Sequence, residues 1–203
     1  MAESLVAVTQ GSGKNLHTWN RTIGANSVED EYVLLGENGL ASYMIVAQMS
    51  TATADSHLLQ IMAGASLKVR VRRIEITQLT LATTVTLMDV ALLRLTSAGT
   101  GGTAVTPQVL DTADGASGAT GMKLPTAKGT EGGNPGRSTM YMMQTLGVSA
   151  TLGQPGLVWD FDRPRSKPLV IPAGAANGLA IKNVTAVAAG NVTIQVWIDE
   201  ANF

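Results

Sequence analysis

The sequence predicts an all-β protein folded as an antiparallel β sandwich, and three observations lead to this prediction. Apolar and polar residues alternate with a period of two along several segments, most clearly over residues 192–198. This period places one set of side chains on each face of a strand. Gly and Pro, at 22 and 7 of 203 residues, recur between these segments as turn residues. No segment is predicted as a helix, so the apolar strand faces must pack on one another in two layers.

Residues 1–40 are predicted to form an extended N-terminal arm, because polar, Gly and Asn residues are mixed there with isolated apolar ones. Such an arm is either disordered by itself or ordered by lying on a neighbouring subunit. In the second case His17, Trp19 and Tyr32 would be its anchors. The remainder, residues 41–203, is predicted to form the β domain.

Strands are predicted over residues 41–47, 57–62 and 67–81. In the third segment Val69 and Val71 alternate with basic residues, whereas Ile74 and Ile76 continue the alternation one residue out of phase. A β-bulge at Arg72 or Arg73 would restore the phase. We interpret the basic residues of this strand as a charged outward face, with contact to acidic groups of a partner protein as the alternative.

Residues 83–96 form the next predicted strand, and its second half is apolar on both faces. A strand of this kind is either sandwiched in the core or pressed against another chain. Asp89 within it requires a partner such as an arginine or a backbone N–H. A loop excursion rich in Gly, Thr and Ala follows over about residues 97–137, with little regular structure expected.

Later strands are predicted over residues 139–146, 148–152, 157–161, 169–171, 178–182 and 192–198. In the segment 157–161, Trp159 and Phe161 share one face. Eight or nine strands separated by Gly and Pro turns predict a two-sheet sandwich of the jelly-roll type.

Composition restricts the classes of function. Charged residues make up 14% of the chain, against a usual value of about 25%, so we expect part of the surface to be buried in a homo-oligomer. The net charge of −1 argues against nucleic-acid binding. The chain contains no Cys, no apolar run typical of a membrane helix and no signal-peptide pattern at its start. We therefore expect no membrane partner.

Residues suited to catalysis are few, and we predict no catalytic, cofactor-binding or metal-binding site. The only histidines are His17 and His57, and neither lies in a recurring metal-ligand spacing. In Asp55-Ser56-His57, adjacent side chains on an extended chain point to opposite faces and cannot form a catalytic relay. Asp160 and Asp162 can place two carboxylates on one face, for glycoside chemistry or Ca²⁺, but a structural role is the preferred interpretation because no third acidic ligand is nearby.

One segment resembles a known family. The residues of 92–120, LLRLTSAGTGGTAVTPQVLDTADGASGAT, are similar to a segment that recurs in small virion structural proteins of tailed bacteriophages. The matching residues are Gly102, Thr103, Ala104, Thr106, Pro107, Asp111 and Asp114. The pattern at Leu169–Gly174 followed by Gly178–Ile181 is similar to the end of the same proteins.

The resemblance implies a non-enzymatic capsid decoration, or cement, protein: a jelly-roll trimer that binds the major capsid protein on the outside of a phage head. It would be assembled in the host cytoplasm and would stabilise the shell. On this interpretation the subunit or capsid contacts are expected at Trp19, Tyr32, Thr86, Met88, Val90 and Leu92. The alternatives are a tail, baseplate or head-fibre component, and a carbohydrate-binding β sandwich, which would carry a row of exposed aromatics.

Overall fold

The computed structural model describes residues 18–23, 26–31, 40–51, 53–80, 82, 86–142, 156–162, 168–185 and 190–201. The chain divides into two compact units, Met1–Gly39 and Leu40–Phe203. In the first unit, β1 (Thr18–Ile23) and β2 (Asn26–Glu31) pair as an antiparallel hairpin. Neither strand shows a sustained alternation of apolar and polar residues, so neither was predicted from the sequence.

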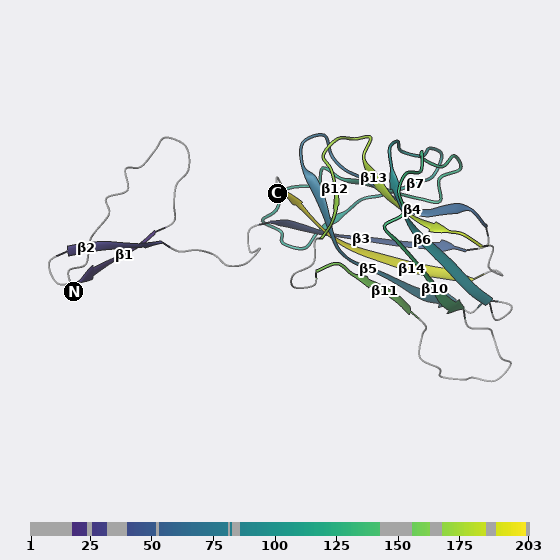
Figure 1. Cartoon of the computed structure of the whole chain (residues 1–203), viewed down its shortest axis with the longest axis horizontal. Helices are drawn as coiled ribbons and strands as arrows, with labels where there is room; N and C mark the ends of the chain where they lie inside the picture. Colours follow the sequence, from purple (N-terminus) through teal and green to yellow (C-terminus); the bar gives the residue numbers. More distant parts are fainter. Residues whose placement is uncertain are drawn as a thin grey trace. The chain divides into compact units, whose positions relative to one another are not determined.

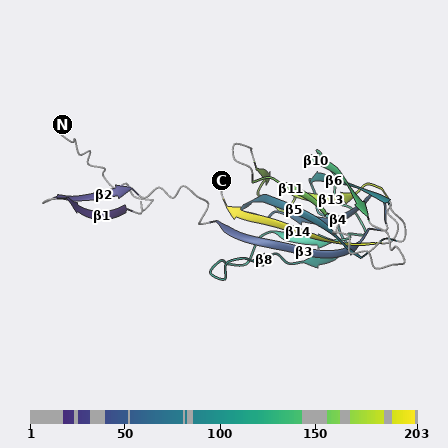
Figure 2. The same cartoon turned by 90° about the horizontal axis from the view of Figure 1, so that it is seen from below.

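The second unit consists of two antiparallel sheets (Figures 1 and 2). One sheet, here the β14 sheet, has the order β11-β5-β14-β3-β8, and β12 also pairs with β5. The other, here the β6 sheet, has the order β10-β6-β13-β4-β9-β7. The strands are β3 (Ala41–Ser50), β4 (Ser56–Met62), β5 (Lys68–Thr80), β6 (Thr86–Leu95), β7 (Thr103–Val105), β8 (Gln108–Val109), β9 (Thr120–Lys123), β10 (Gly136–Met142), β11 (Gly156–Asp160), β12 (Leu169–Ile171), β13 (Gly178–Asn183) and β14 (Asn191–Ala201). The described residues contain no helix, which confirms the all-β sandwich.

Strand pairing in this unit is nested along the chain. β3 pairs with β14, β4 with β13, β5 with both β11 and β12, and β6 with β10. The nested pairs are joined sideways, because β14 also pairs with β5 and β13 also pairs with β6. Strands that are distant in sequence therefore lie side by side, and strands that follow one another mostly enter opposite sheets.

The core lies between the two sheets and follows the predicted period of two. Alternate side chains of β14 face inward and are at most 1% exposed: Val192, Ile194, Val196 and Ile198. They pack against inward residues of the opposite sheet, among them Met88, Val90 and Leu92 of β6. Full burial of each aliphatic side chain contributes about 1.5–3 kcal/mol, so this layer is the main source of stability.

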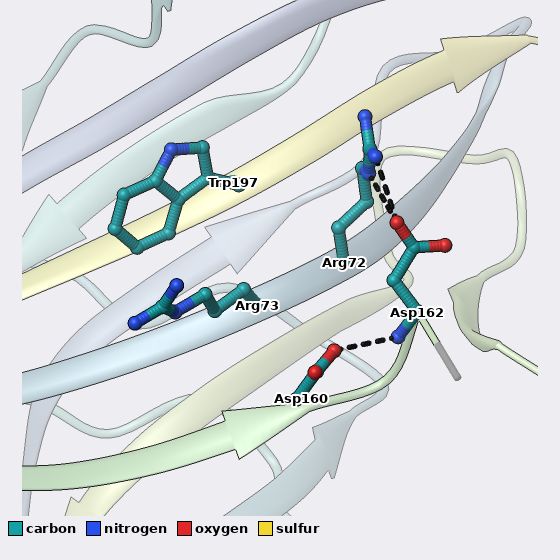
Figure 3. Close-up of a pocket in the computed structure, with 5 residues that line it drawn as sticks. All are labelled: Arg72, Arg73, Asp160, Asp162 and Trp197. Atoms are coloured by element: carbon teal, nitrogen blue, oxygen red, sulfur yellow. Dashed lines mark hydrogen bonds and ion pairs between the residues drawn. The ribbon is translucent and has the colours of Figure 1, made fainter. Parts of the chain in front are cut away.

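The predicted bulge in β5 is confirmed. Trp197 lies opposite Arg73 and Ile198 opposite Val71, so Arg72 has no opposing residue on β14. The extra residue lets Val71 and Ile74 both face the core although they are three positions apart. As a consequence Arg72 and Arg73, adjacent in sequence, both line the outer side of the β14 sheet (Figure 3).

The excursion over residues 97–137 contains more regular structure than predicted. It forms β7 and β9, which extend the β6 sheet, and β8, which extends the β14 sheet. Glu200 at the end of β14 accepts hydrogen bonds from the Ser117 hydroxyl and from the backbone N–H groups of Gly118 and Ala119, at 2.6–2.9 Å. Pairing with distant strands and this buried carboxylate order a segment that local composition predicts to be irregular.

The later predicted strands are confirmed in part. Residues 143–146 and 148–152 lie outside the described residues, whereas Tyr141 and Met142 end β10. The three closing segments are strands, but they are divided between the sheets: β12 and β14 belong to one and β13 to the other. In β11, Trp159 packs against the core from the same face as Leu157, and Phe161 just beyond the strand also packs on the core.

Candidate functional site

Side chains from three strands and one strand end surround a hollow on the outer face of the β14 sheet (Figure 3). The cross-strand register places Asp160 of β11 opposite Arg73 of β5, Arg73 opposite Trp197 of β14, and Trp197 opposite Met44 of β3. The hollow has a volume of about 420 Å³ and is lined by Arg72, Arg73, Asp160, Asp162 and Trp197. Regular strand pairing and the β5 bulge therefore bring these five residues together.

The charged groups of the hollow are paired within the chain. Arg72 donates two hydrogen bonds to one carboxylate oxygen of Asp162, at 2.7 and 3.1 Å. Arg73 donates to Glu75 at 2.8 Å, and its guanidinium lies 5.3 Å from the centre of the Trp197 ring. A cation over an indole face is attracted by the negative face of the ring, so Arg73 orients the indole from one side.

Asp160 holds the end of β11 in place. Its Oδ1 accepts the backbone N–H of Asp162 at 3.0 Å, and Asp162 in turn binds Arg72. Figure 3 shows the ion pair of Arg72 and Asp162 apart from the indole, with Asp160 on the β11 side of the hollow. The hollow thus combines an aromatic plate, guanidinium donors and carboxylate acceptors on one surface.

Next to the hollow, Arg70 and Asp199 form a buried ion pair. Arg70 donates to Asp199 Oδ2 from Nε at 3.2 Å and from Nη2 at 2.8 Å, and the Ser42 hydroxyl donates to Oδ1 at 2.8 Å. Asp199 is 1% exposed and Arg70 8%. Arg70 is therefore buried and does not belong to the charged outward face that the sequence predicted, whereas Arg72 and Arg73 lie on that face, each bound to an acidic group of the same chain. Contact of Arg72 and Arg73 with a partner protein stays a prediction.

Three of the six residues predicted to contact another subunit or the capsid lie in the core of the sandwich. Met88, Val90 and Leu92 are 0% exposed inside the sandwich, so they have no surface left for another subunit, and the prediction of contacts there is corrected. The chain's own second sheet provides their burial. The opposite face of β6 is also largely covered, in a second apolar cluster made by Met62, Ala91, Leu93, Leu95 and Ala180.

The other three predicted contact residues are placed only in part. Thr86 is the first residue of β6 and Trp19 lies in β1, with their side chains outside the description. Tyr32 lies outside the described residues. These three therefore remain predictions.

An exposed apolar pair lies on the edge of the β6 sheet. Tyr141 of β10 is directly opposite Leu87 of β6, and the two are 66% and 51% exposed. The alternation of β6 was predicted from the sequence, but the exposure of Leu87 was not. Leu87 lies on the same face of the strand as Ala91 and Leu93, which are both buried. The same face holds the ion pair between Asp89 and Arg137, so of the two kinds of partner predicted for Asp89, an arginine or a backbone N–H, the structure shows the arginine.

A network of polar groups surrounds His57, which is 0% exposed. Gln60 Oε1 accepts the Gly99 N–H at 2.8 Å, so its Nε2 is left to donate to His57 Nδ1. His57 Nε2 then donates to Glu131 at 2.9 Å. The neutral imidazole with its proton on Nε2 is the form that satisfies all of these groups.

Four charged groups continue this network: Asp55, Lys128, Glu131 and Lys182. Hydrogen bonds from Lys128 and then Lys182 lower the pKa of Asp55 to about 2. Burial lowers the pKa of His57, while the hydrogen bond to Glu131 opposes this shift. The Ser56 hydroxyl donates to the Thr53 carbonyl instead of contacting His57. The network therefore connects the excursion to β4 and β13, and it does not hold the geometry of a catalytic triad.

Within the described ranges, no group of three or more His, Asp and Glu side chains is arranged to hold a metal ion. The described part of the chain also contains no helix with the length and apolarity needed to span a membrane.

Comparison with known proteins gives no match to a family model, to a curated protein or to a solved structure.

Proposed function

We propose that this chain is a non-enzymatic virion structural protein that binds the outside of a phage capsid as a homotrimer and stabilises the shell. The sandwich would be a jelly roll, and residues 1–40, which include the β1/β2 hairpin, would be an N-terminal arm that lies on a neighbouring subunit. The major capsid protein is the partner, and the capsid surface is the location after assembly in the host cytoplasm.

The nested strand pairing is the observation that carries this proposal. A long hairpin whose pairs β3/β14, β4/β13, β5/β11 and β6/β10 are rolled into two sheets is the arrangement expected of a jelly roll. Jelly rolls are typical of viral capsid domains and of lectins. The resemblance of residues 92–120 to a segment of phage virion proteins favours the first of these two classes.

The contact surface would include Leu87 and Tyr141. Exposed aromatic and aliphatic side chains that lie side by side are typical of the centre of a protein interface. The low content of charged residues, 14%, agrees with burial against other subunits. In a trimer, three weak contacts to the shell would act together, and avidity would raise the overall affinity.

Two measurements test the proposal. Light scattering is expected to give the mass of a trimer. Co-sedimentation with expanded capsids of the virus that encodes the chain, stripped of this protein, is expected to bring the chain down with the shell. A monomer that stays in the supernatant would contradict the proposal.

The alternative is a tail, baseplate or head-fibre component, since the recurring segment is not confined to one part of the virion. Binding to purified tails and not to expanded heads would favour that alternative.

A further inference from the structure

We propose that the hollow lined by Arg72, Arg73, Asp160, Asp162 and Trp197 binds a neutral saccharide, with one sugar ring against the Trp197 indole. This inference is independent of where the chain lies in the virion. It assigns a ligand class to a surface that shell binding through Leu87 and Tyr141 leaves open, because that pair lies on the other sheet.

The first step is the position of Trp197. Its neighbours on the outer face of β14 are Gln195 and Asp199, so a large aromatic side chain occupies a polar row and stays partly exposed. The Arg73 guanidinium lies over one side of this indole, 5.3 Å from the ring centre, and the part of the ring that stays exposed offers an apolar surface with a polar N–H. The ring C–H groups of a sugar match such a plate, because one face of a pyranose is apolar while its edge carries hydroxyls.

The second step is the β5 bulge. Bulges are enriched beside functional sites, where they redirect a side chain. Here the extra residue places Arg72 at the hollow beside Arg73, where Arg72 binds Asp162 at 2.7 Å. Without the bulge, the alternation would direct only one of the two arginines to this face.

The charged groups of the hollow favour a ligand without a net charge. Two guanidinium groups and two carboxylates line the hollow, so the charges of the lining sum to zero. Arg72 is paired with Asp162, and Arg73 is paired with Glu75 outside the lining, so both arginines are already neutralised and offer little attraction to an anion, whereas Asp160 can accept a hydrogen bond from a hydroxyl group. A hydroxyl group both donates and accepts, so it can donate to Asp160 or Asp162 and accept from an arginine without breaking charge neutrality.

The volume of the hollow is suited to a small molecule. A volume of about 420 Å³ lies within the range of about 300–1,000 Å³ found for small-molecule sites. The polar groups of the hollow are exposed, so a ligand must displace the water bound to them, and the free energy gained on binding is smaller. The expected affinity is therefore weak, with a Kd on the order of 1 mM.

The test is a titration of the full chain with methyl glycosides of glucose, galactose, mannose and N-acetylglucosamine, followed by NMR of the tryptophan indole N–H signals. At least one glycoside is expected to shift the Trp197 signal in a saturable manner in the millimolar range. In the Trp197→Ala variant, the glycoside is expected to cause no shift of the other indole signals or of the backbone signals near the hollow. Asp160→Asn, which preserves side-chain shape, is expected to weaken binding at least threefold.

The matched control is Tyr141→Ser, which removes an exposed aromatic outside the hollow and is expected to leave the titration unchanged. Thermal unfolding verifies that each variant is folded. Three results would overturn the proposal: no glycoside moves the Trp197 signal, the response persists in the folded Asp160→Asn and Trp197→Ala variants, or inorganic phosphate binds this hollow more tightly than every glycoside. Capsid co-sedimentation is a separate readout, so failure of one proposal leaves the other testable.

Discussion

Asp199 shows how much a single residue depends on its partners in this protein. It lies on the outer face of the β14 sheet, where a carboxylate would normally be hydrated, yet it is 1% exposed and accepts hydrogen bonds from Arg70 and Ser42. Arg72 Nη1 lies farther away, 3.8 Å from Oδ1. A buried charge that loses its partner is costly, since the remaining ion is neither hydrated nor neutralised.

Replacing Arg70 with Met is therefore expected to lower the free energy of unfolding by about 3–5 kcal/mol. Urea denaturation measures this loss. The matched control is Arg137→Met, which leaves Asp89 without its ion-pair partner at a position that is 15% exposed, against 1% for Asp199. Because water reaches Asp89 more easily, that control is expected to cost clearly less than Arg70→Met. Equal losses for the two variants would contradict the distinction.

His57 predicts a pH dependence of stability. Its pKa in the folded protein is lowered from 6.5 by burial, so below that pH the unfolded chain binds more protons than the folded one. The contribution is fully present above about pH 6.5 and is lost as the pH falls toward the folded pKa. The slope is at most about 1.4 kcal/mol per pH unit for one proton.

Thermal unfolding between neutral and mildly acidic pH checks this prediction. The wild-type melting temperature is expected to fall, and His57→Gln is expected to be less stable at neutral pH but flatter in its pH profile. Asp55, with a pKa of about 2, titrates at lower pH and does not mask the effect. Parallel profiles for wild type and variant would show that another group is responsible.

At the scale of an element, β5 depends on one extra residue. The bulge at Arg72 keeps Val69 and Val71 in phase with Ile74 and Ile76, and all four face the core. Because side chains alternate in a strand, a shift by one residue turns the whole segment over.

Deleting Arg72 is therefore expected to prevent cooperative folding, because the shift would move Val69 and Val71 to the outer face or break the pairing with β12 and β14. Arg72→Ala keeps the bulge while it removes the exposed ion pair with Asp162 and the longer contact, at 3.8 Å, with Asp199, so it is expected to fold and to cost much less than the deletion. Circular dichroism and thermal unfolding compare the two. A folded deletion variant with wild-type stability would contradict the role of the bulge.

The loop before β9 depends on a carboxylate from β14. Glu200 accepts from Ser117, Gly118 and Ala119, and a Gln in its place offers one acceptor oxygen instead of two. Glu200→Gln is expected to lower stability by about 1–3 kcal/mol and to speed proteolytic cleavage in residues 110–119. Glu75→Gln, at a partly exposed position, serves as the control and is expected to leave the cleavage rate unchanged.

At the scale of the whole molecule, several large apolar residues of the described sandwich remain exposed, and Leu87 and Tyr141 are a pair among them that lies directly opposite on neighbouring strands. A surface pair of this kind contributes little to folding, because both side chains remain in contact with water. Its value would lie in association.

The double variant Leu87→Ser, Tyr141→Ser is expected to keep wild-type stability within about 0.5 kcal/mol and to lose binding to expanded capsids. Co-sedimentation measures the binding. The control is Val46→Ser, an exposed aliphatic position on the β14 sheet, which is expected to bind as wild type does. Undiminished capsid binding by the double variant would exclude this surface.

The sequence alone determined the local features of this protein: the positions of most strands in residues 41–201, the buried face of β14 and the bulge in β5. Each of these features follows from the alternation of apolar and polar side chains within one segment, so it can be recognised without knowledge of the other strands. A need for a partner at Asp89 was also readable, since a carboxylate in an apolar strand is costly, although Arg137 could not be singled out.

Only the tertiary structure decided which strands pair and what covers each face. β13 and β14 follow one another in sequence but enter different sheets, and β6 is covered on both faces largely by its own chain. The hollow could not be predicted, because Arg73 meets Asp160 and Trp197 through pairing between strands that are 87 and 124 residues apart in sequence. The physical reason is that the periodicity of a strand is set by its own residues. Which strands pair depends on how well their apolar faces are buried against segments that are distant in sequence.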